Sequence, residues 1–177
     1  RYQTALEFVK VAERLNSVYK GVKNFETEIQ FSKHSTVAHW NAHLADSLEP
    51  LENNYYQGLE KGNVEYAFHS LLFQCFYRLF TGQPLDSVKS KFDSSLPIFK
   101  SKNQSYHEIY CGVWYEMLLN LHSPMRDPLT LEGDWFDETT HLEELIEKGD
   151  VTTQLCYHIA KMELGYLFHQ FEDAEKH

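Results

Sequence analysis

The chain has 177 residues and a formal net charge of −10, with 42% apolar and 15% aromatic side chains. This length and apolar content suit one domain that can bury a sizeable core and argue against intrinsic disorder. Because an acidic surface repels phosphate backbones and anionic lipid, and because no run of 18 apolar residues occurs, neither nucleic-acid nor membrane partners are expected.

Apolar side chains recur at helical spacing from the start of the chain. Residues 2–22 predict a helix with one apolar stripe, made of Ala5, Phe8, Ala12, Leu15, Tyr19 and Val22. Gly21 and Asn24 weaken the helix at its end. Residues 24–36 have no firm period, which predicts a short helix and a loop.

A second stripe and the strongest helix of the chain follow. The stripe runs from Val37 through Trp40 to Tyr55, and Pro50 within it predicts either a kink or two helices that meet there. Gly62 is expected to end this helix in the left-handed conformation, and Asn63 to cap the next one. Residues 64–80 are apolar over most of the helix circumference, so neighbours must cover several sides.

The second half of the chain continues in the same manner. Residues 85–99 predict an amphipathic helix frayed by Pro97, and residues 106–121 a widely buried helix. Residues 123–134, with two prolines and one glycine, predict the longest loop.

Two helices are expected at the end of the chain. Thr140 and Glu143 fit a capping box that would start a helix ending at Gly149. Asp150 would cap a last helix with an apolar stripe made of Val151, Leu155, Ile159, Met162 and Tyr166.

Glu-Lys-Gly-Asn/Asp-Val occurs twice, at residues 60–64 and 147–151, each time before a long apolar helix. Recurrent helix–turn–helix units bury faces that one hairpin cannot cover. With no strand-like alternation, the pattern predicts an all-α fold of antiparallel helix hairpins, stacked as a TPR-like α-solenoid over residues 1–177 as a single domain.

Residues 37–82 resemble the helical, tetratricopeptide-like region of bacterial multi-sensor signal-transduction kinases, both serine/threonine and histidine kinases, that carry a signalling ATPase module. A Trp-bearing helix, a Tyr-rich segment and a Gly-Leu-Glu joint carry the resemblance, at Trp40, Tyr55, Gly58, Leu59, Glu60, Gly62, Glu65, Tyr66, Ala67, Gly82 and Leu85. The later segment is similar through Ile109-Tyr110, the acidic loop 132–138, the run 166–168 and the joint 171–174, so the likeness covers about residues 36–177.

The resemblance implies a non-catalytic scaffold or sensor linker, cut from a larger multidomain cytoplasmic kinase, whose partners are neighbouring domains or another protein. Three scattered cysteines, Cys75, Cys111 and Cys156, agree with a reducing compartment. No Gly-rich phosphate loop occurs, so kinase or ATPase chemistry is not expected in this segment, and neither are catalytic residues or cofactors.

Three groups of polar residues could suggest chemistry, and each has a simpler structural interpretation. His39 and His43 have the spacing of zinc-binding helices, but Trp40 stands where a metalloprotease has its general base. His107-Glu108 begins like a phospho-accepting motif and then continues with core residues. The acidic run 132–144 lacks the spacing of a calcium loop and favours helix capping. No metal site is therefore expected.

The aromatic excess leaves two alternatives open. The rings either form the core and the contacts between repeats, or line a groove that binds a peptide or regulator. A groove would make the chain an independent TPR-like binding module. Its candidate partner-binding aromatics are Tyr55, Tyr56, Tyr66, Phe73 and Tyr77.

Overall fold

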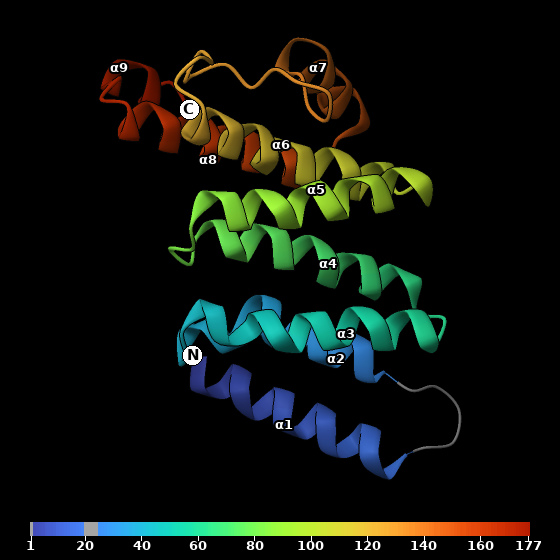
Figure 1. Cartoon of the computed structure of the whole chain (residues 1–177). Helices are drawn as coiled ribbons and strands as arrows, with labels where there is room; N and C mark the ends of the chain where they lie inside the picture. Colours follow the sequence, from blue (N-terminus) through green and yellow to red (C-terminus); the bar gives the residue numbers. More distant parts are fainter. Residues whose placement is uncertain (1, 20–24) are drawn as a thin grey trace. The chain divides into compact units, whose positions relative to one another are not determined.

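Helices form nearly all regular structure of the chain, as the computed structural model in Figure 1 shows. The structure describes residues 2–19 and 25–177, and within these ranges the only β-type pairing is an isolated bridge between Glu132 and Asp137. The prediction of an all-α fold is confirmed. The chain divides into two compact units, Arg1–Gly82 and Gln83–His177.

The first unit contains four α-helices among its described residues, joined in the middle by irregular helical turns. They are α1 (Tyr2–Val18), α2 (Glu26–Ser32), a π-helical turn (Lys33–Val37), 3₁₀ turns (Ala38–Trp40 and Leu44–Ser47), α3 (Leu48–Glu60) and α4 (Val64–Leu79). The predicted end of the first helix, with Gly21, Val22 and Asn24, lies outside the described residues.

α3 and α4 pack along their length as a hairpin, and α2 lies against both. Leu51, Phe68 and Cys75 are fully buried in this core. Asn54 is also buried, and its side-chain amide donates to the Thr27 carbonyl of α2 (3.0 Å) and to the Ser70 hydroxyl of α4 (2.9 Å). One buried amide therefore ties three helices together.

The chain breaks its helix before Leu48 rather than at Pro50. His43 is extended, and its ring Nδ1 accepts a hydrogen bond from the Ala45 backbone N–H (3.1 Å), which starts a new helical turn. Pro50 then falls in the first turn of α3, where its missing N–H is not needed. Of the two predicted alternatives, the structure has separate helical segments.

The second unit contains α5 (Leu85–Ser101), α6 (Ser105–His122), α7 (Glu138–Lys148), α8 (Val151–Leu167) and the short α9 (Phe171–Ala174). α6 packs against both α5 and α8. The prediction that Pro97 frays α5 is wrong, because the helix continues through it. Phe92, Leu96 and Phe99 are fully buried on this helix, and their packing outweighs the lost hydrogen bond.

Residues 123–137 connect α6 to α7 and lie on α6; we call them the strap. The predicted long loop lies here, but it is not merely a surface connection, because Leu131 and Phe136 are fully buried. Gly112 of α6 makes the close approach possible, since a Cβ there would lie 2.4 Å from the Trp135 carbonyl oxygen. The predicted capping box is wrong: α7 begins at Glu138, and Asp137 caps it by accepting from the Thr139 N–H (2.8 Å).

Four helix–helix joints close in the same way. Gly62, Asn103, Gly149 and His169 have positive φ angles of 54–74°. After each, the next backbone N–H bonds the carbonyl five residues back, at 2.7–3.0 Å, which is the Schellman closure. Asp150 caps α8 through the Thr153 N–H (3.0 Å) as predicted. Asn63 does not cap α4; it donates instead to the Thr27 hydroxyl (2.7 Å).

We expect Gly149→Ala to lower the free energy of unfolding by about 1–2 kcal/mol, because alanine is strained at φ 67° although open space surrounds this position. Gly149→Asn should cost much less, since asparagine tolerates this conformation. Urea titration followed by circular dichroism measures both. An equal loss in the two variants would contradict the argument.

Candidate functional site

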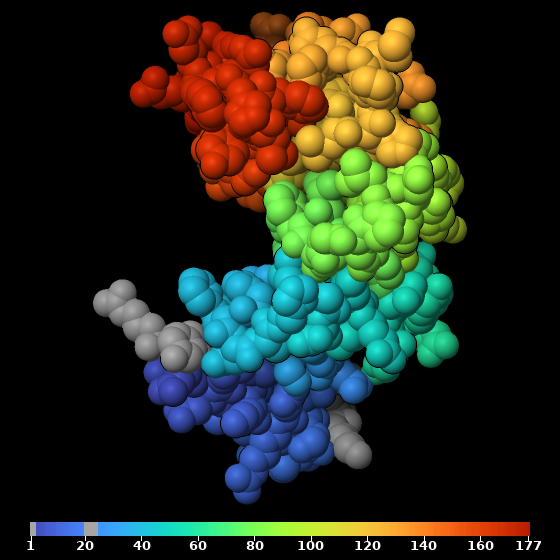
Figure 2. Space-filling view, turned by 60° about the vertical axis from the view of Figure 1, so that its left-hand side comes forward, coloured from blue at the N-terminus to red at the C-terminus, as the bar shows by residue number. Residues whose placement is uncertain are grey.

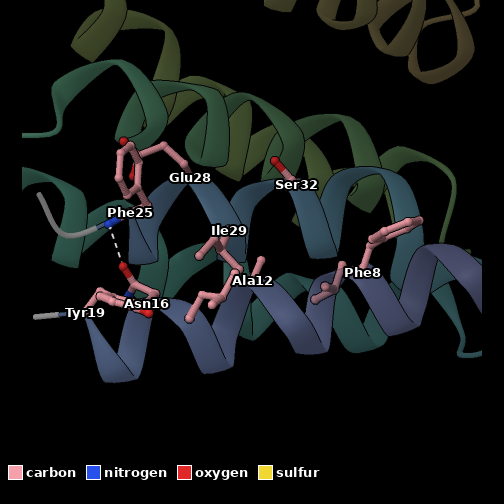
Figure 3. A pocket seen from close by; sticks show the side chains of 10 residues that line it. Phe8, Ala12, Asn16, Tyr19, Phe25, Glu28, Ile29 and Ser32 are labelled. Carbon is pink, nitrogen blue, oxygen red and sulfur yellow. Dashed lines mark hydrogen bonds between the residues drawn. The ribbon is translucent and has the colours of Figure 1, made fainter.

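An apolar groove of about 690 Å³ lies between α1 and α2. The two helices run antiparallel there, and Ala12 and Ile29 face one another across its middle (Figure 3). The side chains that line it are mostly apolar, and the three polar ones are Asn16, Glu28 and Ser32. The full lining consists of Phe8, Val9, Ala12, Leu15, Asn16, Tyr19, Phe25, Glu28, Ile29 and Ser32. We call this the α1/α2 groove.

Polar contacts attach α1 to the following helices on one side of the groove. The Asn16 side chain accepts from the Phe25 N–H at the start of α2 (2.9 Å). Glu13 accepts from Gln30 (3.2 Å) and pairs with Lys33 (2.9 Å). The hydrogen bond from Lys33 lowers the pKa of Glu13, so the carboxylate stays charged at neutral pH.

The stripe predicted on the first helix is covered on one side only. Ala5 and Ala12 are half-buried, whereas the Phe8 and Tyr19 side chains are 71% and 72% exposed. Large apolar side chains that are exposed side by side mark interaction sites more often than scattered single ones do. The groove is open along a length of helix, and its lining offers apolar contact rather than a nucleophile with an adjacent base.

The five predicted partner-binding aromatics are divided between the core and the surface of α3 and α4. Tyr77 is buried, its hydroxyl donates to the Ser35 carbonyl (2.6 Å), and burial raises its pKa to about 12. Phe73 and Tyr66 pack their rings on Phe31 of α2, at centroid distances of 5.2 and 5.7 Å.

The rings of the remaining two predicted aromatics, Tyr55 and Tyr56, lie against each other with their centroids 5.1 Å apart. Of these two side chains, only Tyr56 is exposed. None of the five lines the α1/α2 groove. The predicted residues and the groove are therefore separate features of the first unit.

The histidines of the first unit do not converge. His43 caps a helical turn, while the His39 ring lies tilted beside the Trp40 ring at a centroid distance of 5.3 Å, so the two histidines do not share one helix face. His34 faces the Ser47 hydroxyl (3.4 Å), and burial lowers its pKa. Within residues 2–19 and 25–177, no group of three or more His, Cys, Asp or Glu side chains is placed to hold a metal ion. His107 is buried and stacks on Phe99 at 5.6 Å.

Arg126 forms a second polar cluster, which the sequence did not indicate. Its guanidinium pairs with the buried Glu116 of α6 (2.7 Å) and donates to the Asn120 side chain (2.7 Å) and to the Glu132 carbonyl (2.6 Å). Burial raises the pKa of Glu116, and the hydrogen bond from Arg126 opposes that rise. This arrangement, the Arg126 clamp, holds the strap on α6.

Lys161 of α8 binds the middle of the strap and the start of α7. Its ammonium group pairs with Glu138 (2.8 Å) and donates to the Leu129 carbonyl. In both clusters a charged side chain forms ion pairs and hydrogen bonds that hold the strap to the helices. We therefore interpret both clusters as structural attachments of the strap. These residues pair with partners that are distant in the sequence, and no short sequence motif around them indicates the pairing.

The chain matches no known protein family, no curated protein and no solved structure. Among the described helices, none combines the length and the apolar character needed to cross a bilayer. The three cysteines are buried and form no disulfide.

Proposed function

We propose that this chain is a non-catalytic helical-repeat scaffold that mediates protein contacts. The α1/α2 groove is the observation that carries the proposal, because it leaves a helix-length apolar surface open. The groove's lining suits a helix of another domain or protein, which would place apolar anchors at i, i+3, i+4 and i+7.

The four similar joints support the repeat part of the proposal. Each places a left-handed residue and an i to i−5 hydrogen bond between neighbouring helices. In a TPR-like solenoid, antiparallel hairpins stack so that each covers its neighbour. Together with the resemblance to multi-sensor kinases, this favours a linker or sensor segment of a cytoplasmic signalling kinase.

A second candidate function is an independent module that captures a peptide or regulator. The groove favours this candidate as much as the linker, since both need an apolar helix as partner. They differ in where the partner resides: in the same polypeptide for the linker, and in another molecule for the module.

We expect a fluorescent, uncharged amphipathic peptide, with leucines on one face and glutamines on the other, to bind the groove. Leu15→Asp should weaken binding at least tenfold, because a charge would have to be desolvated against the apolar lining. Fluorescence anisotropy gives the affinity, and methyl NMR should show shifts at Ala12 and Ile29.

The matched control is Met125→Asp, at a 91% exposed side chain of the second unit, which should leave the peptide's affinity unchanged. Peptide binding that Leu15→Asp leaves intact would rule out the groove as the site. Incubation of the chain with radiolabelled ATP and Mg²⁺ tests the non-catalytic part, and phosphate incorporation would contradict it.

A further inference from the structure

The apolar stripe of α8, made of Val151, Leu155, Ile159, Met162 and Tyr166, faces outward from the second unit except at Ile159, which is half-buried. The sequence predicts an apolar helix face here, yet Val151, Leu155 and Tyr166 are 71%, 58% and 65% exposed. The opposite side of α8 supplies the core, through Cys156, Tyr157, Ala160 and Leu164. We call the outward set the α8 stripe.

The stripe continues onto α9. The Phe171 ring is exposed and lies 6.0 Å from the Tyr166 ring, measured between centroids. Gly165 lets α9 lie close to α8, since a Cβ there would meet the Ala174 backbone at 2.9 Å. In Figure 2 the end of α8 and α9 (red) form one continuous surface of the second unit.

The spacing of the stripe fits a helical partner. Its members recur every three or four residues along α8, which spans 17 residues and hence about 25 Å at 1.5 Å per residue. Such a row packs into the groove between side-chain ridges of a second helix. An extended strand would instead need a free sheet edge, and the described residues contain none.

The charges around the α8 stripe indicate which kind of helix can bind it. Residues 138–177 contain nine carboxylates and three lysines. Each lysine already pairs within the segment: Lys148 with Glu144, Lys161 with Glu138, and Lys176 with Asp173.

Two of the carboxylates without an ion pair lie next to the stripe in the chain. Glu163 follows Met162, and Glu172 follows Phe171; neither makes an ion pair with a described residue. A second copy that used the same face would bring these like charges together, and an anionic surface would be repelled.

We propose that the α8 stripe docks a basic amphipathic helix of a protein partner, with apolar residues on the stripe and Lys or Arg beside Glu163 and Glu172. This surface lies in the second unit and does not depend on the α1/α2 groove. Acidic edges around an apolar centre speed the encounter and set which partner binds.

The test compares two labelled 18-residue helical peptides, both with leucines on one face, one with lysines and the other with glutamates on the opposite face. We expect the lysine peptide to bind the full chain at least tenfold more tightly than the glutamate peptide at low salt. Leu155→Asp and Val151→Asp should each weaken the lysine peptide at least tenfold. Aspartate at residue 151 also suits the first turn of α8, so this second variant is expected to fold.

Glu163→Gln with Glu172→Gln should reduce the salt dependence of binding while leaving the apolar contacts in place. Met125→Asp, at an exposed residue outside both the α8 stripe and the α1/α2 groove, is the matched control and should change nothing. No binding, equal binding of both peptides, or loss of binding only in Leu15→Asp would overturn the proposal. Self-association in sedimentation that Leu155→Asp abolishes would overturn it in favour of a second copy.

Discussion

Replacing Arg126 by methionine should lower the free energy of unfolding by about 3–5 kcal/mol, since it leaves a buried charge without its partner. Glu116 is fully enclosed by α6 and the strap, and its carboxylate has the guanidinium of Arg126 as its counter-ion. The substitution also removes the hydrogen bonds that Asn120 and the Glu132 carbonyl receive. Urea unfolding, followed by circular dichroism, measures the loss.

Two further variants show whether the buried charge is the cause. Arg126→Met combined with Glu116→Leu should recover part of the loss, because no uncompensated carboxylate remains. Lys148→Met breaks the exposed pair with Glu144 and should leave the unfolding midpoint unchanged. If Arg126→Met behaved like Lys148→Met, the clamp would have no structural role.

Phe136→Ala should lower the free energy of unfolding by about 3–5 kcal/mol, because it removes a fully buried ring and leaves a cavity. The ring stacks on His141 at 5.5 Å and lies 6.1 Å from the Tyr157 ring of α8. Phe136 therefore joins the strap to α7 and α8, while Arg126 joins it to α6. Urea unfolding again gives the change.

Met125→Ala is the matched control for the strap, because its side chain is 91% exposed. It should leave stability unchanged. Hydrogen exchange in Phe136→Ala should rise along the strap and at the start of α7 before it rises in α5. Equal acceleration throughout the second unit would show that the strap has no independent opening.

The sequence predicts the helices well because local spacing determines them. The repeated Glu-Lys-Gly-Asn/Asp-Val segment does mark two joints, and Gly62 and Gly149 adopt the expected left-handed conformation. Asn103 and His169 close two further joints in the same conformation, which was not expected because both lack the glycine signal. A side chain at positive φ is less common, so these joints are hidden in the sequence.

The sequence could not show which apolar stripe is covered. The stripes of α1 and α8 have the same helical period as those of α4 and α6, yet parts of both are exposed. Burial depends on what lies next to a helix, and periodicity reports only the helix itself. For the same reason, the five candidate aromatics did not indicate the α1/α2 groove.

The strap is the segment whose structure the local sequence predicts least well. Two prolines and a glycine predict the longest loop of the chain at residues 123–134. The structure instead buries Leu131 and Phe136 and pairs Arg126 with a carboxylate ten residues earlier in the chain. The Arg126–Glu116 pair needs α6 to be formed, and the contact of Phe136 with Tyr157 needs α8 as well.

The Schellman closures have a consequence for folding speed. Each is completed within six residues, so the entropy lost in closing a hairpin is small. Chains dominated by contacts of low sequence separation reach the native state in microseconds to milliseconds. We therefore expect the α3–α4 and α5–α6 hairpins to form early, whereas the strap, which needs α6, α7 and α8 in place, should be the slow step of its unit.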